Sequence, residues 1–200
     1  MASTKYVTKR DGKQVCMMPE KIFARIKRLS YDLPSTLKLQ KIVDATIPKI
    51  TEGMKTREID HLTSETCADM VNENEKDCAH YTTLAARILV SDMHKETHKC
   101  LKKTMAELKV SEQTMKMVND FASDLNSHIV HANDYRYSLP ELKQLQAKLS
   151  RNENGKLLER PSHHVMRNAI EQLLEENDHQ DITQANVIIN RFKKLEQNVV

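Results

Sequence analysis

The beginning of the chain is organised by one short stretch, Val7-Thr8-Lys9-Arg10-Asp11-Gly12-Lys13-Gln14, followed by Pro19-Glu20-Lys21-Ile22. The pair Asp11-Gly12 stands between two short β-prone runs, and this dipeptide is typical of a two-residue hairpin of type I′. A helix is expected to open directly after the second run, because Pro19 suits the first turn of a helix. The stretch therefore predicts a hairpin folded over a helix, and the cations that it would bring together are Lys9, Arg10 and Lys21.

Composition favours a helical protein. Apolar residues make up 39% of the 200 residues and aromatic residues 4%, with ten methionines, three glycines and no tryptophan. Such a sequence predicts a mainly α fold with an aliphatic, methionine-rich core. The charged residues, 30% of the chain, nearly balance to a net charge of +3, which argues against a dedicated nucleic-acid-binding surface. No apolar run approaches about 18 residues and no signal peptide is recognisable, so we expect no membrane partner.

The glycines and cysteines exclude several kinds of site. The glycines stand alone at Gly12, Gly53 and Gly155, so neither a Walker A loop nor a G-x-G-x-x-G motif is present. A bound nucleotide would therefore have its phosphates held mainly by cationic side chains. No C-x-x-C pair joins the cysteines, which are Cys16, Cys67, Cys78 and Cys100. We expect reduced thiols in a cytoplasmic protein, with no sequence motif of a catalytic nucleophile.

Hydrophobic periodicity predicts helices along the whole chain. They are expected at about 19–29, 36–50, 56–71, 80–108, 111–131 and 138–150, then after Arg160-Pro161-Ser162 and from Asp181 through Leu195. Pro48 should kink or shorten the second helix and Thr56 should cap the third, while Ser138 and Glu141 have the spacing of a capping box. The end of the long fourth helix gives the predicted domain boundary, with one domain over residues 1–110 and a second over 111–200.

Two interpretations of the cations at the hairpin stay open from the residues alone. They form either an ordinary solvated basic surface or a cradle for an anionic ligand. Thr56 and Asp60 stand four residues apart at a helix start, where they share one face. They serve either as a cap and a dipole-favoured acid, or as a polar pair that faces the same ligand.

Histidine spacing gives only a weak metal motif. His94 and His98 share a helical face in the manner of zinc ligands, but no second pair of ligands has a matching spacing. The adjacent His163 and His164 are interpreted as surface residues. We therefore predict neither a metal site nor a self-contained catalytic site in these residues.

The motif Val7-x-Lys9-Arg10-Asp11-Gly12, followed by Lys21-Ile22, resembles an ATP-cone. It resembles specifically the cone at the N-terminus of the large subunit of class I ribonucleotide reductases of the eukaryotic and viral type. Three further segments resemble later parts of that subunit in the same order, Leu84-Ala85-Ala86-Arg87-Ile88 … His94-Lys95-Glu96-Thr97, Leu125-Asn126-Ser127 and Asn154-Gly155-Lys156-x-x-Glu159-Arg160-Pro161-x-His163-x-x-Met166-Arg167. The resemblance covers residues 5 to about 170.

The resemblance implies a short β-hairpin cap on a four-helix bundle, followed by a helical segment of the reductase. Such cones bind ATP, which activates the enzyme, or dATP, which inhibits it through an oligomer formed by the cones, and Mg²⁺ accompanies the nucleotide. By resemblance, the residues around the triphosphate are Lys9, Arg10, Val15, Cys16, Met17, Met18, Pro19, Glu20, Lys21 and Lys95. Thr56 and Asp60 would meet the nucleoside end.

The chain also departs from the family pattern. Val15 and Cys16 stand where charged residues are common, and Pro19 stands where phenylalanine is usual. The family's catalytic cysteines and radical tyrosines lie in a barrel that follows the matched region. The resemblance thus implies an allosteric ATP- or dATP-binding part of a ribonucleoside-diphosphate reductase (an oxidoreductase of deoxyribonucleotide synthesis and DNA replication), truncated or split, that does not catalyse alone.

The expected partner is the reductase catalytic large subunit or its missing C-terminal part, together with self-association through the cone. A second interpretation is a non-enzymatic regulatory or decoy protein that pairs with a full-length large subunit. A cone-containing transcriptional repressor is disfavoured, because such repressors carry a zinc ribbon of C-x-x-C pairs before the cone and none precedes Val7.

Overall fold

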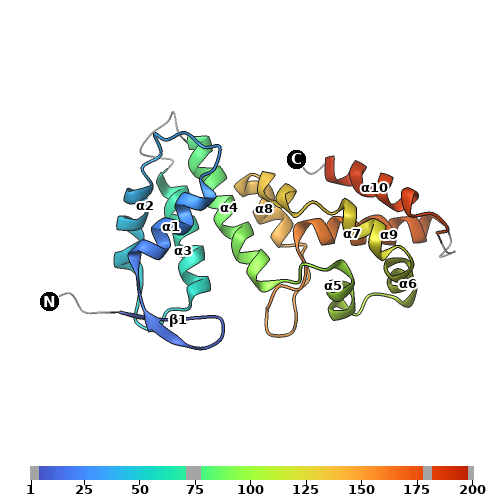
Figure 1. Ribbon diagram of the computed structural model, residues 1–200, viewed down its shortest axis with the longest axis horizontal. Coiled ribbons are helices and arrows are strands. Elements are labelled where there is room, and N and C mark those ends of the chain that lie inside the picture. Colours follow the sequence, from blue (N-terminus) through green and yellow to red (C-terminus); the bar gives the residue numbers. More distant parts are fainter. Residues whose placement is uncertain (1–4, 71–77, 178–181, 198–200) are drawn as a thin grey trace. The chain divides into compact units, whose positions relative to one another are not determined.

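The computed structural model describes residues 5–70, 78–177 and 182–197 (Figure 1). The chain forms two compact units, Met1–Asp92 and Met93–Val200, and the division falls within helix α4 (Cys78–Glu96). This division comes earlier than the domain boundary expected near residue 110. The two expected domains, residues 1–110 and 111–200, stay a prediction. The sequence-based prediction of a mainly α fold with a hairpin at its beginning is confirmed.

The hairpin pairs β1 (Tyr6–Thr8) with β2 (Gln14–Cys16) in antiparallel register, with Thr8 opposite Gln14. Its loop is closed by two hydrogen bonds, from Lys9 N to Lys13 O (2.9 Å) and from Gly12 N to Lys9 O (3.0 Å). Gly12 has a φ of 81°, whereas the positive-φ residues other than glycine in the described chain are Asp32 and Lys109. The loop between Lys9 and Lys13 therefore has three residues, and only its last residue, Gly12, takes the left-handed conformation. The predicted type I′ turn is wrong, because it has two loop residues and needs this conformation at both.

The first unit is a four-helix bundle with the hairpin at one end (Figure 1). Its helices are α1 (Pro19–Leu29), α2 (Leu39–Thr46), α3 (Thr56–Asp69) and the greater part of α4. At Pro48, α2 gives way to the short 3₁₀ helix η1 (Ile47–Lys49), as predicted. The cap of α3 is Lys55 rather than Thr56, because the Glu58 carboxylate accepts a hydrogen bond from Lys55 N at 2.9 Å. The expected end of this helix at residue 71 lies outside the described residues.

Helices α3 and α4 approach closely through small and polar side chains. Ser64 Oγ donates a hydrogen bond to Ala85 O at 2.8 Å, and the Cys67 thiol donates to Tyr81 O at 3.3 Å. Both α3 residues are buried, so their hydrogen bonds offset the loss of water around the polar atoms. Cys67 is thus a small packing residue between α3 and α4.

The hairpin is fixed to the segment that leads into α3. Thr8 N donates to Met54 O at 3.0 Å, and Thr8 Oγ1 donates to Gly53 O at 2.9 Å. Gly53 N in turn donates to Tyr6 O at 2.9 Å. Beneath these bonds, Val7 packs in a small core with Ile50 and Ile59. The loop of the hairpin is therefore held near the start of α3.

The second unit is built around α9 (Pro161–Glu176). Its other elements are α5 (Leu101–Leu108), α6 (Glu112–Asp120), α7 (Ala122–His128), η4 (His131–Arg136), α8 (Leu139–Gln146) and α10 (Ala185–Gln197). Met166, Ala169 and Ile170 of α9 lie in one core with residues of α5, α6, α7 and α10. The predicted capping box at Ser138 is confirmed, since its side chain accepts from Glu141 N and the Glu141 carboxylate accepts from Ser138 N.

Two predicted helices are interrupted. The helix expected over residues 80–108 ends at Glu96, because Arg160 Nη2 donates to the terminal carbonyls of His94 (3.1 Å) and Thr97 (3.3 Å). The helix then resumes as α5 at Leu101. The helix expected over residues 111–131 is divided into α6 and α7 at Phe121. The predicted start of the last helix at residue 181 lies outside the described residues, and α10 begins at Ala185.

The interpretation of His163 and His164 as surface residues is wrong. His163 is fully buried and His164 is 8% exposed. His163 Nδ1 shares a hydrogen bond with Thr104 Oγ1 at 2.9 Å, and burial lowers the pKa of His163 to about 3. His164 Nδ1 lies 3.0 Å from the buried Glu159 carboxylate. The adjacent rings are buried because α9 is surrounded on several sides, which a search for one apolar helix face does not detect.

Glu159 lies at the centre of a second set of buried polar contacts, besides the one between His163 and Thr104. Its carboxylate contacts the Arg167 guanidinium at 3.0 Å and accepts a hydrogen bond from Ser150 N at 3.0 Å. Burial alone would raise the pKa of Glu159, but the hydrogen bonds from His164 and Arg167 outweigh it and lower the pKa to about 2. The carboxylate is therefore charged in the folded protein near neutral pH.

We expect the free energy of unfolding to fall as the pH drops from about 6.5 toward 3. The folded-state pKa of His163 lies near 3 and its ordinary value is 6.5, so the unfolded chain binds the additional proton in this window. One such proton corresponds to a slope of about 1.4 kcal/mol per pH unit. Glu159, whose pKa is also lowered, adds to the loss below its ordinary value of 4.5.

Urea denaturation of the full chain followed by circular dichroism at several pH values measures this slope. His163→Asn keeps a group at the Nδ1 position and should flatten the slope between pH 6.5 and 4.5. His98→Asn is the control, because the His98 side chain is 47% exposed. Equal slopes in the wild type and in His163→Asn would contradict the assignment to His163.

Candidate functional site

Two carboxylates of the first unit are buried beside the hairpin loop. Asp60 on α3 is 7% exposed and Asp92 on α4 is 2% exposed. Arg10, from the hairpin loop, forms an ion pair with Asp92 through Nη2. The same nitrogen lies 3.8 Å from Asp60 Oδ2. The structure thus brings together Arg10 and Asp60, two residues that the sequence resemblance predicts at one ligand.

Asp92 also has two polar side chains of α3 beside it. Its Oδ2 lies 3.3 Å from His61 Nε2 and 3.7 Å from Arg57 Nε. Burial by itself would raise the pKa of Asp92, but the hydrogen bond from His61 and the charge of Arg10 outweigh it and lower the pKa. Asp92 is therefore ionised in the folded protein at neutral pH.

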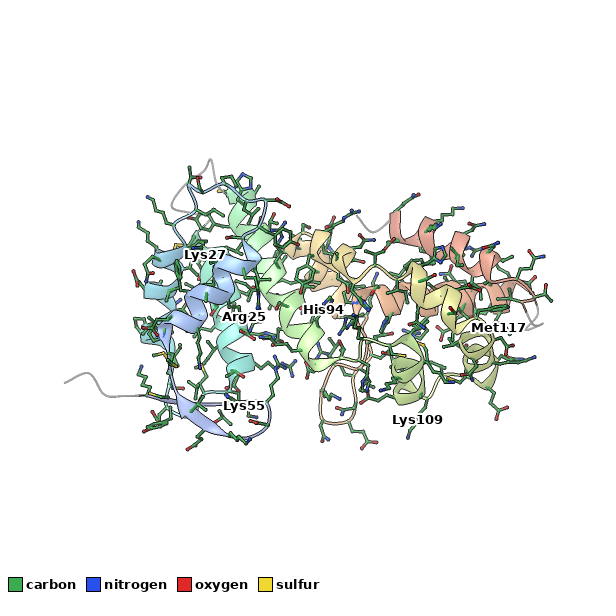
Figure 2. All side chains as sticks on the ribbon, in the orientation of Figure 1. Arg25, Lys27, Lys55, His94, Lys109 and Met117 are labelled. Carbon is green, nitrogen blue, oxygen red and sulfur yellow. The ribbon has the colours of Figure 1, made fainter. Side chains whose placement is uncertain are left out.

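Asp60 has its own arginine. Arg25 on α1 forms an ion pair with Asp60 Oδ1 through Nη1, and its Nη2 lies 3.4 Å from Ser91 Oγ. The Arg25 side chain is only 15% exposed. In Figure 2, Arg25 lies in the middle of the first unit, whereas Lys27 of the same helix lies nearer its outer edge. Arg25 thus reaches across the bundle and connects α1 with α3 and α4.

We call this group the carboxylate–arginine cluster, and its members are Arg10, Arg25, Arg57, Asp60, His61 and Asp92. Its charges do not balance, because three guanidinium groups face two carboxylates. The Arg10 and Arg57 side chains remain 32% and 34% exposed, whereas the carboxylates are buried. The cluster therefore presents an excess of positive charge toward solvent, which favours an anionic ligand.

The local sequence explains how α3 contributes to the cluster. Arg57, Asp60 and His61 are separated by three and four residues, so they share one face of the helix. Arg10 reaches the same face because backbone hydrogen bonds fix the hairpin to the segment just before α3. Asp92 comes from α4, which packs against α3 at Ser64.

The other predicted cations, and Thr56, lie on the hairpin and on three helices. Lys9 and Lys21 are exposed, the first next to Arg10 in the hairpin loop and the second in the first turn of α1. Thr56 is half-buried and begins α3, one turn before Asp60. Lys95 is exposed in the last turn of α4, within the second unit. Its participation in a site with the hairpin stays a prediction.

The predicted segment from Val15 to Glu20 divides into two kinds of position. Val15 and Met17 are half-buried and pack against the small core of Val7, Ile50 and Ile59, so they support the hairpin. Cys16 and Met18 are exposed. The remaining two, Pro19 and Glu20, line a hollow of about 250 Å³ with Phe23, Gln40 and Val43. Roles of these six residues in ligand binding stay predictions.

Sequence reasoning missed four members of the cluster, Arg25, Arg57, His61 and Asp92. One signal was present for α3, where charged residues recur at three- and four-residue spacing on a helix of low apolar content. No comparable signal marks Asp92, whose burial depends on contacts from distant parts of the chain.

Within the described residues, no group of three or more histidines, cysteines, aspartates and glutamates has the arrangement of a metal site. No helix of that part of the chain has both the length and the apolar character needed to cross a membrane.

Comparison with known proteins gives one family and several relatives. Residues 5–96 match the family described as ATP cone domain. The chain is 35% identical over 179 residues to the Saccharomyces cerevisiae protein "Ribonucleoside-diphosphate reductase large chain 2", covering 82% of this chain and 20% of that protein. It is 34% identical to the variola virus large subunit and 32% identical to that of Arabidopsis thaliana, with 23% and 21% of those proteins covered. The chain thus spans about a fifth of the length of the curated relatives it matches.

The pair between Arg25 and Asp60 should contribute strongly to stability. Arg25→Met removes the cation beside a buried carboxylate and is expected to lower the free energy of unfolding by about 3 kcal/mol. Lys27→Met is the matched control on the same helix, because Lys27 is exposed, and it should change the value by less than about 0.5 kcal/mol.

Urea denaturation followed by circular dichroism measures both variants. The double variant Arg25→Met/Asp60→Asn should recover part of the loss, because it removes the buried charge together with its partner. If Arg25→Met proves as stable as Lys27→Met, the buried pair does not contribute as described.

Proposed function

Because this chain belongs to the family of ribonucleoside-diphosphate reductase large subunits and carries an ATP cone at residues 5–96, we propose that it binds ATP or dATP as an allosteric ligand. The observation that supports this proposal is the positive excess of the carboxylate–arginine cluster beside the hairpin loop. A nucleotide triphosphate is an anion suited to such a surface. This favours the anion cradle over an ordinary basic surface.

In the proposed complex, cationic side chains hold the phosphates. The residues concerned are Lys9, Arg10, Lys21 and Lys95, of which Lys9 and Lys21 are exposed and ready to contact a ligand. Each charge-assisted hydrogen bond contributes about 1.5–3 kcal/mol, so a few of them suffice for micromolar affinity without a glycine-rich loop. Mg²⁺ would accompany the phosphates. The segment from Val15 to Glu20 would border the ligand on the hairpin side.

Thr56 and Asp60 are proposed to meet the nucleoside. A carboxylate accepts hydrogen bonds from sugar hydroxyl groups, and the Thr56 hydroxyl both donates and accepts. Arg25 fixes the Asp60 carboxylate through Oδ1. Oδ2 lies 3.8 Å from Arg10 Nη2, so a ligand at this oxygen would lie beside a cation of the phosphate end.

The proposed role of these 200 residues is regulation rather than catalysis. They would sense the adenine nucleotide pool for deoxyribonucleotide synthesis, while ribonucleotide reduction takes place in other parts of a reductase. The proposed partner is accordingly the remainder of a reductase large subunit, with self-association through the cone as a second contact.

Isothermal titration with ATP and with dATP, each in the presence of Mg²⁺, tests this function. We expect the full chain to bind with micromolar affinity. Lys9→Gln/Lys21→Gln should weaken binding by about tenfold or more, because two exposed phosphate contacts are lost without disturbing a buried pair. Lys27→Gln is the control, since Lys27 is exposed on α1 and is absent from the proposed site.

The absence of heat with either nucleotide at millimolar concentration would reject the proposal. An equal loss of affinity in Lys27→Gln would show that net charge alone, rather than the named lysines, determines binding.

A further inference from the structure

We propose that Asp92 is an internal anion that lowers the affinity of the cone for nucleotide phosphates by holding Arg10. This inference rests on the proposed nucleotide-binding function and concerns an affinity-determining residue of the same site. It starts from the convergence of two guanidinium groups and one imidazole on one buried carboxylate.

Both oxygens of Asp92 are occupied. Oδ1 pairs with Arg10 of the hairpin loop, and Oδ2 lies beside His61 and Arg57 of α3. The Asp92 side chain is 2% exposed, whereas the side chains of its three partners are 32–43% exposed. The anion is therefore beneath the cations, and a ligand that approaches from solvent meets the cations first.

A phosphate can contact Arg10 in two ways. It can take over the Nη2 donors, in which case Asp92 loses its ion pair and is left buried with less compensation. Alternatively it can use other N–H donors of the guanidinium, which has five in total. The buried negative charge of Asp92 then opposes the phosphate across the same guanidinium, and burial protects this repulsion from screening by salt.

Asp60 differs from Asp92 in this respect. Its ion pair with Arg25 comes from inside the bundle, and its distance to Arg10 Nη2 is 3.8 Å. Arg10 is therefore held chiefly by Asp92. The charge of Asp92, more than that of Asp60, determines how readily Arg10 turns to a ligand.

Asp92→Asn tests the inference. The amide keeps the size of the side chain and an acceptor oxygen for Arg10, but removes the charge. Isothermal titration of the full chain with Mg²⁺–ATP should give binding about tenfold tighter than in the wild type. Asp44→Asn is the matched control, because it removes the same charge from an exposed position on α2 and should leave the affinity unchanged.

A thermodynamic cycle with Arg10→Gln separates this effect from a general change of charge. In the Arg10→Gln background, Asp92→Asn should improve ATP affinity by much less than tenfold, because the residue through which it acts is gone. A full tenfold gain in that background would overturn the assignment to Arg10.

The outcomes distinguish the inference from the function on which it rests. If the wild type binds ATP and Asp92→Asn binds equally or more weakly, the inference fails and the proposed function stands. If only Asp92→Asn binds, the inference is supported and nucleotide binding by the native chain is rejected. If neither protein binds, both proposals are overturned.

Chemical modification gives a second measurement that does not require a variant to fold. Phenylglyoxal modification of the nucleotide-free wild type, mapped by mass spectrometry, should be slower at Arg10 than at Arg28, an exposed guanidinium of α1. Equal rates would show that Asp92 does not hold Arg10 and would overturn the inference.

Discussion

A carboxylate buried in a helical bundle must have cations beside it, because otherwise it takes up a proton or destabilises the fold. The cone buries two such groups, Asp60 and Asp92, and compensates them with guanidinium groups from the hairpin, α1 and α3. These compensating charges connect the hairpin, α1 and α3 with α4. Movement of the hairpin loop or of α1 would leave a buried carboxylate without its guanidinium partner. The need to compensate the buried charges therefore helps to hold the hairpin loop and α1 in place.

Local sequence signals determined the elements of the first unit well. The hairpin, the start of α1 at Pro19 and the break of α2 near Pro48 all follow from residues within a few positions of the feature. The interruption of the helix expected over residues 80–108 could not be predicted in this way. It depends on Arg160, which lies far along the chain and donates to the carbonyl of His94 in α4 and to that of Thr97 just after it.

The candidate site was predictable only in part, for a related reason. Arg10 and Asp60 belong to recognisable motifs, and the structure brings them together. The partners that surround them are charged residues on different helices, and their significance comes from burial rather than from a pattern. His163 and His164 show the same effect in the second unit, where a helix surrounded on several sides buries rings that a search for one apolar face assigns to the surface.

The way in which the hairpin is attached also determines which of its residues can change during evolution. The bonds to the segment before α3 use backbone atoms of Tyr6, Thr8, Gly53 and Met54, together with the side chains of Lys5, Thr8 and Glu52. Val7 supplies the main buried contact of β1. Apart from Arg10, the exposed positions of β2 and of the loop are therefore under little structural constraint, so they can change in the course of evolution while the hairpin keeps its attachment.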